Sequence, residues 1–212
     1  ALMFNFQLSY LDDNTHYLNL GKALYTGEGY VRIDLPEKPQ ENIVSPGLPM
    51  LFASIMTLRN DTKDLFLFKL AATVSMWLGI LIFAYILIRY LKINKLIVLG
   101  MIIFLSFNQR LIMYASMCST ESFFIFFSIL VVLLLMEFDR NKKIKYFILA
   151  IVFSVIALFM KVTGLPFVLA VFLWFLFTKR YKFSFIYLAA VIIGIGMWLF
   201  PTWISHGWGY QD

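Results

Sequence analysis

Residues 120–160 read TESFFIFFSILVVLLLMEFDRNKKIKYFILAIVFSVIALFM, an apolar run, a basic turn and a second apolar run. Each run approaches the roughly 20 residues that an α-helix needs to cross the hydrocarbon core of a bilayer. The turn between the runs carries Arg140, Lys142, Lys143 and Lys145. Because Lys and Arg are enriched in cytoplasmic loops, this stretch predicts two transmembrane helices joined on the cytoplasmic side.

The same alternation continues through the rest of the chain after residue 64. Two more short turns are basic, one with Arg89, Lys92 and Lys95 and one with Lys179, Arg180 and Lys182, whereas the intervening turns carry only Arg110 and Lys161. Residues 5–64 and 205–212 are therefore expected outside, which implies a multi-pass protein of the plasma (inner) membrane with its active face external or periplasmic. The predicted spans are about 65–90, 96–115, 120–138, 144–160, 164–178 and 183–204, and the short fourth or fifth could be re-entrant.

The composition agrees with a membrane protein. Hydrophobic residues make up 61% of the chain and charged residues 14%, against an apolar share of roughly 45–50% in soluble domains. The net charge of +6 sits in short loops and not in a patch, so no nucleic-acid partner is expected. The predicted fold is all-α, a polytopic transmembrane helical bundle with an external loop carrying two short interfacial helices. The oligomeric state is left open.

Two amphipathic helices are predicted before the first span. The stretch from Asp13 can cap a helix whose apolar residues repeat at helical spacing up to a stop at Gly27. After an irregular segment, Ser45-Pro46-Gly47-Leu48-Pro49 predicts a rigid turn into a helix at about 49–59, with Pro49 in its first turn. The expected organisation is an external first loop at 1–64 and a bundle of about six spans at 65–212. Since the chain opens without a charged n-region, we expect a fragment that lacks a first span.

The charged residues on the outer side are the candidates for chemistry. Asp12 and Asp13 lie at the start of the first helix, where one carboxylate could act as a general base and the other could cap the helix. Asp13 is the better cap, which leaves Asp12 as the candidate base. Asp12, Asp13 and His16 could also hold a divalent metal, but their spacing does not support one, and no cofactor is expected. His206, near Trp203 and Trp208, is either an interfacial residue or a sugar contact.

Two more charged residues open later spans. Glu121 is either a first-turn acid favoured by the helix dipole or a substrate contact. Lys161 precedes Thr163-Gly164, and a cation beside exposed backbone N–H groups at a helix start makes a phosphate site. Arg110 is a second candidate, although a cation near a span end often only reaches the lipid headgroups.

The order of these motifs resembles the N-terminal half of the GT-C superfamily of integral-membrane glycosyltransferases. It is most similar to the bacterial relatives of dolichyl-phosphate-mannose protein mannosyltransferases and to the lipid A aminoarabinose transferase. The resemblance covers most of residues 10–180, and it implies a fragment that also lacks the C-terminal half of such a protein. It is carried by the acidic pair, Gly27-Glu28-Gly29-Tyr30, the turn at Ser45, Thr120-Glu121-Ser122 and Lys161-Val162-Thr163-Gly164. Two departures are Ser45-Pro46 where many relatives have Pro-Pro, and Lys161 where many have Arg.

The resemblance implies transfer of a sugar from a polyprenyl-phosphate-linked donor to a lipid, glycan or protein at the outer face. By position, Asp12 corresponds to the catalytic base of the family and Asp13 to its acidic partner. The expected partners are the donor and membrane lipid. Two alternatives stay open, a transporter or flippase of a lipid-linked substrate and a non-catalytic membrane subunit. The candidate substrate-binding residues are Lys161, Arg110, Glu121, His16 and Tyr17.

Overall fold

The described part of the chain is almost entirely helical. This computed structural model describes residues 13–41, 44–62, 65–117 and 119–206, of which residue 13 and residues 198–206 are described by their backbone alone. Within these ranges the only strand-like pairing is an isolated antiparallel bridge between Val31 and Gln40, so the all-α prediction is confirmed. The elements are α1 (Asp13–Tyr25), α2 (Gly47–Arg59), α3 (Leu65–Arg89), α4 (Lys95–Ser106), α5 (Gln109–Ser116), α6 (Thr120–Asn141), α7 (Ile144–Met160), the 3₁₀ turn η1 (Val162–Gly164), α8 (Leu165–Phe177) and α9 (Tyr181–His206).

Helices lie at all six predicted span positions, but they differ in length. By length and composition, α3 and α6 can each cross a membrane, and α4 with α5 makes a third span if the bent pair counts as one. The helices α2, α7 and α8 are shorter, and α9 is apolar over residues 181–197, where its side chains are described. For example, the 17 residues of α7 extend about 25 Å at 1.5 Å per residue, slightly less than a hydrocarbon core of about 30 Å.

The predicted span at 96–115 is broken in the structure. Its two halves, α4 and α5, meet at an angle of 61°. The break has a local cause, because the side chain of Asn108 accepts hydrogen bonds from the N–H groups of Arg110 and Leu111 at 3.0 and 3.2 Å and so starts a new helix. From the sequence we considered a re-entrant segment at 144–160 or 164–178 and did not predict this bend between α4 and α5.

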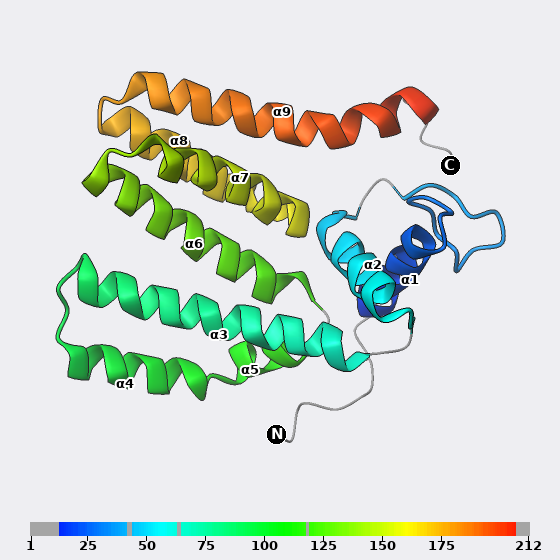
Figure 1. The fold of residues 1–212 in the computed structure, drawn as a ribbon, viewed down its shortest axis with the longest axis horizontal. Helices are drawn as coiled ribbons and strands as arrows, with labels where there is room; N and C mark the ends of the chain where they lie inside the picture. The colour runs from blue at the N-terminus through cyan, green and yellow to red at the C-terminus, as the bar shows by residue number, and fades with distance from the viewer. Residues whose placement is uncertain (1–12, 42–43, 63–64, 118, 207–212) are drawn as a thin grey trace.

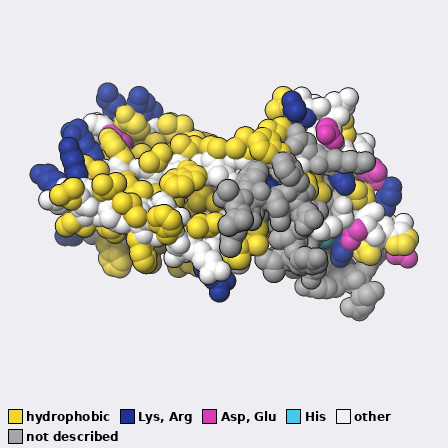
Figure 2. All heavy atoms as spheres, turned by 90° about the horizontal axis from the view of Figure 1, so that it is seen from below, with side chains coloured by type: hydrophobic (Ala, Val, Ile, Leu, Met, Phe, Trp, Pro, Cys, Tyr) yellow, Lys and Arg dark blue, Asp and Glu magenta, His cyan; other side chains and the backbone are white. Residues whose placement is uncertain are grey.

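The three basic turns lie together at one end of the bundle. In Figure 1 the connections α3–α4, α6–α7 and α8–α9 are all on the left, and α1 and α2 lie at the opposite end. Figure 2 shows Lys and Arg side chains gathered at that left end, next to a broad hydrophobic surface. We call the end with the three basic turns the basic end, and the end with α1 and α2 the loop end. The alternation of charge along the sequence is therefore a real separation in space.

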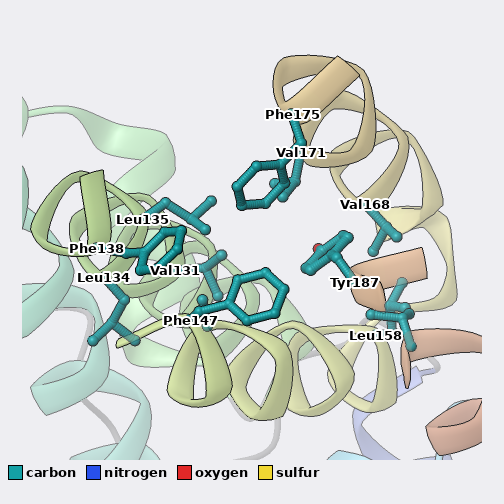
Figure 3. Packing of buried hydrophobic residues seen from close by; sticks show 12 residues of the cluster. Val131, Leu134, Leu135, Phe138, Phe147, Leu158, Val168, Val171, Phe175 and Tyr187 are labelled. Carbon is teal, nitrogen blue, oxygen red and sulfur yellow. The ribbon is translucent and has the colours of Figure 1, made fainter. Parts of the chain in front are cut away.

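An aromatic core holds α6, α7, α8 and α9 together near the basic end (Figure 3). Phe138 of α6 packs against Phe147 of α7 with ring centroids 5.4 Å apart, and Phe147 meets Phe175 of α8 edge to face at 5.7 Å. Such pairs contribute about 0.5–1.5 kcal/mol each beyond the area they bury. Tyr187 of α9 is fully buried and donates a hydrogen bond to the Ser154 hydroxyl of α7 at 2.9 Å.

The two predicted helices of the external loop are both present and pack on each other. Gly21 of α1 faces α2 so closely that an added Cβ would lie 2.8 Å from the Cβ of Phe52. Phe52 and Met56 of α2 are fully buried and belong to one cluster with Phe68 of α3 and Met160 of α7. Hence α2 packs against the ends of α3 and α7, and α1 packs against α2.

Candidate functional site

The loop end joins α1 to the segment before α2 through a buried carboxylate. Nε2 of His16, on α1, lies 2.7 Å from Oε2 of Glu41. Glu41 is only 6% exposed, and its other oxygen accepts a hydrogen bond from the N–H of Val44 at 3.2 Å. An acid buried to this degree is normally paired. Glu41 therefore has a structural role that the sequence did not indicate. Its contact engages the imidazole of His16, which we had considered for substrate binding.

Two tyrosines pack beside this contact. The hydroxyl of Tyr30 donates a hydrogen bond to the carbonyl of Val44 at 3.0 Å. Burial, together with the charge of Glu41, raises the pKa of Tyr30 well above its usual range, so its hydroxyl remains a donor at neutral pH. Tyr17 is partly buried against the cluster that contains Phe52 and Phe68. The ring of Tyr17 therefore contributes to the packing of the loop end.

The acidic pair falls at the edge of the described residues. Asp12 lies outside them, and α1 begins at Asp13, whose side chain is also outside the description. His206 ends α9, again with the backbone alone described. Among the described side chains, no three His, Cys, Asp or Glu residues gather as metal ligands. Of the residues considered for a metal in the sequence analysis, Asp12, Asp13 and His16, only His16 has a described side chain.

Lys161 and Glu121, forty residues apart in sequence, form an ion pair at the loop end. Nζ of Lys161 is 2.7 Å from Oε1 of Glu121, and their side chains are 33% and 27% exposed. Glu121 stands in the first turn of α6, as the helix-dipole argument predicted. Lys161 follows the last residue of α7 and precedes η1. A lysine ammonium has three N–H donors, and Glu121 takes one of them. The pair therefore keeps donor capacity for an anion.

The backbone around Lys161 differs from the prediction. We expected exposed N–H groups where the next helix starts, but the N–H of Gly164 donates to the carbonyl of Lys161 at 2.9 Å. The N–H of Val162 donates to the Ser45 hydroxyl at 3.1 Å. The N–H of Leu165 donates to the carbonyl of Val162. These three amides are already used inside the protein, and we base the phosphate hypothesis on the Lys161 ammonium.

The turn before α2 seats the loop segment on the end of α7. Ser45 is 8% exposed and accepts the hydrogen bond from Val162. At Gly47 an added Cβ would lie 2.5 Å from the carbonyl oxygen of Phe159 and 2.8 Å from the nitrogen of Met160. Only glycine fits there, because the opposing atoms are backbone. The motif Ser45-Pro46-Gly47 thus holds the loop against Met160 and Val162, the chain neighbours of Lys161. Its sequence did not indicate this role.

Arg110 does not join this group. It is the second residue of α5, it is exposed, and its guanidinium makes no hydrogen bond or ion pair with any side chain that the structure describes. The neighbouring part of α5 is fixed by its backbone, since Thr73 of α3 donates to the carbonyl of Ala115 at 2.7 Å. The arrangement fits the interpretation of Arg110 as a cation that reaches toward lipid headgroups.

Comparison with known proteins adds the family. The family model for dolichyl-phosphate-mannose-protein mannosyltransferase matches residues 50–210. Neither the curated proteins nor the solved structures gave a significant match. The matched region begins within α2 and includes every helix from α3 to α9, and with them Glu121 and Lys161. Because the match covers well over half of the 212 residues, the chain belongs to the dolichyl-phosphate-mannose-protein mannosyltransferase family.

Proposed function

We propose that this protein transfers a sugar from a polyprenyl-phosphate-linked donor to a lipid, glycan or protein acceptor at the loop end of the bundle. The observation that carries the proposal is the partly exposed ion pair between Lys161 and Glu121 at that end, within a chain of this family. The family supports glycosyl transfer by a multi-pass membrane protein. The donor, the residues and the external face are our proposal.

Lys161 is assigned to the phosphate of the donor. Its ammonium has one donor engaged by Glu121 and two left for phosphate oxygens. Glu121 holds the lysine side chain in place, so little reorganisation is needed when charge develops on the leaving phosphate. A preorganised cation of this kind stabilises the transition state more than the ground state. The apolar surface of the bundle beside this end (Figure 2) suits the prenyl chain of such a donor.

Asp12 is assigned as the general base. The acceptor hydroxyl oxygen attacks the anomeric carbon of the sugar, and the bond between that carbon and the phosphate oxygen breaks. The hydroxyl proton passes to the Asp12 carboxylate, and the electron pair of the broken bond leaves with the phosphate beside Lys161. Asp12 directly precedes α1, and α1 is tied to the loop through His16 and Glu41. Asp13 is assigned to the start of α1.

The phosphate assignment is tested by the donor dependence of sugar transfer in the full-length protein. Lys161→Ala should weaken use of the donor about 10- to 100-fold, because a hydrogen bond to a charged group contributes about 1.5–3 kcal/mol. Arg110→Ala is the matched control, since Arg110 is exposed and outside the pair, and it should change little. Glu121→Gln should retain more activity than Lys161→Ala because the cation remains. Equal kinetics for the Lys161 and Arg110 variants would refute the assignment.

The base is tested separately. Asp12→Asn should lower transfer by about 10²- to 10⁴-fold, the usual contribution of general-base catalysis, with donor binding retained. Asp13→Asn should be milder, because Asn caps a helix nearly as well as Asp. A dead Asp13→Asn beside a near-normal Asp12→Asn would reverse the two roles. If both variants were active at matched membrane levels, the acidic pair would be structural.

A further inference from the structure

A cavity of about 600 Å³ opens at the basic end, far along α6 from the residues discussed above. Its deeper walls are apolar, with Val132 and Met136 from α6 and Phe167 and Val171 from α8. Val132 and Arg140 both line the cavity, and eight residues of helix extend about 12 Å. The cavity is therefore a groove that runs along the bundle, apolar inside and polar at its rim.

The rim carries an excess of positive charge. Arg140 lines it, is exposed and makes no ion pair with the side chains that the structure describes. Asp139, also on the rim, is shared by two cations, Arg180 and Lys142, the latter at 2.6 Å. Arg140, Arg180 and Lys142 thus outnumber the two acids at the rim, Asp139 and Glu137, and an anion there would meet an excess of positive charge.

The remaining polar groups at the rim are occupied or face the groove mouth. Tyr90 donates to one oxygen of Glu137, and Asn141 donates to the other. These neutral donors satisfy both oxygens of Glu137, but its negative charge remains and offsets part of the positive charge of the rim. The ring of Trp174 lines the groove, and the guanidinium carbon of Arg180 lies 5.8 Å from its centroid. Trp at the end of an apolar helix is typical of the level of the lipid headgroups.

We propose that this groove binds one anionic glycerophospholipid. An acyl chain would lie between α6 and α8, and the headgroup phosphate would sit at Arg140, beside Arg180 and Lys142. Basic pockets between transmembrane helices recognise anionic headgroups, and each basic residue near such a surface contributes to the attraction. The charge of the rim selects this occupant over a neutral lipid. The site is separate from the proposed donor site, because α6 places Glu121 and Arg140 near its opposite ends.

The experiment counts lipid bound to the purified, delipidated full-length protein by native mass spectrometry, during titration with phosphatidylglycerol or phosphatidylcholine. Phosphatidylglycerol should bind as a single tight molecule and phosphatidylcholine more weakly. Arg140→Gln should weaken phosphatidylglycerol binding about fivefold, the effect expected for one basic residue near an anionic headgroup. Lys95→Gln is the matched control, because Lys95 is exposed at the same end and outside the groove, and it should leave binding unchanged.

A second variant tests the apolar part. Ala170 lines the groove and is exposed, so Ala170→Trp should fill the space and reduce the binding of both lipids. The proposal is overturned if the two lipids bind equally, or if Arg140→Gln and Lys95→Gln have the same effect. It is also overturned if polyprenyl phosphate displaces phosphatidylglycerol at equimolar concentration, since the groove would then be a site for the donor class of lipid. Sugar transfer is not the measurement, so this result and the test at Lys161 can fail independently.

Discussion

Replacing Gly47 by alanine tests the close contact that holds the start of α2 against the end of α7. The new Cβ would lie 2.5 Å from the carbonyl oxygen of Phe159, 2.6 Å from its carbonyl carbon and 2.8 Å from the nitrogen of Met160. All three are backbone atoms of α7 and cannot rotate away as a side chain can. The first turn of α2 must therefore move off α7, which pulls Ser45 away from Val162.

Overpacking of a well-packed site costs about 1–3 kcal/mol. A shift of that size changes the ratio of undocked to docked α2 by about 5- to 150-fold. Gly100→Ala is the matched control, because an added Cβ there meets no atom within 4 Å. Gly164→Ala should be intermediate, since its Cβ would meet the ring of Phe124, a side chain that can turn.

Thiol labelling of a buried position measures the undocked fraction. Leu48 of α2 is fully buried, so a cysteine at Leu48, in a chain with Cys118→Ser, reacts only when α2 leaves its seat. When opening and closing are fast relative to labelling, the rate is proportional to the open population. Gly47→Ala should speed labelling about 5- to 150-fold, and Gly100→Ala should stay within about twofold. Equal rates for these two variants would refute the close approach of α2 to α7.

Two further outcomes are expected. Ser154→Ala should lower the thermal stability of the protein in detergent more than Tyr187→Phe, because it leaves the buried Tyr187 hydroxyl without its acceptor, a loss of about 1–3 kcal/mol; equal losses would contradict the direction of this hydrogen bond. A cysteine at Glu37 should react with a membrane-impermeant thiol reagent in intact cells and one at Lys143 should not, because basic loops face the cytoplasm; the reverse pattern would invert the proposed topology.

The helices themselves could be predicted from the sequence, because each depends on local composition. Apolar runs separated by basic turns predicted α3 and α6 to α9, and proline and glycine at the turns predicted where α1 ends and α2 starts. The one broken span was missed, although Asn108 is a good N-cap residue. The apolar run on both sides of Asn108 favours one continuous helix, and this stronger pattern concealed the local N-cap signal.

The candidate site was only partly predictable. Glu121 and Lys161 were each selected for lying at the start of a span, but nothing in their spacing indicated an ion pair. Beside Lys161, the N–H of Val162 is used by Ser45 and the N–H of Gly164 by the turn itself. Glu41 gave no signal, because an acid in a polar loop becomes informative only when its burial and its contact with His16 are known.

The sequence by itself determined the class of protein, the helix positions and the separation of charge, since these follow from hydrophobicity and residue type along a local stretch of chain. The tertiary structure alone decided which distant residues meet. Lys161 reaches Glu121 forty positions away, Gly47 admits the backbone of α7, and Arg140 faces an apolar groove beside Trp174. Such contacts depend on how helices pack in three dimensions, and the periodicity of a single helix carries no information about its neighbour.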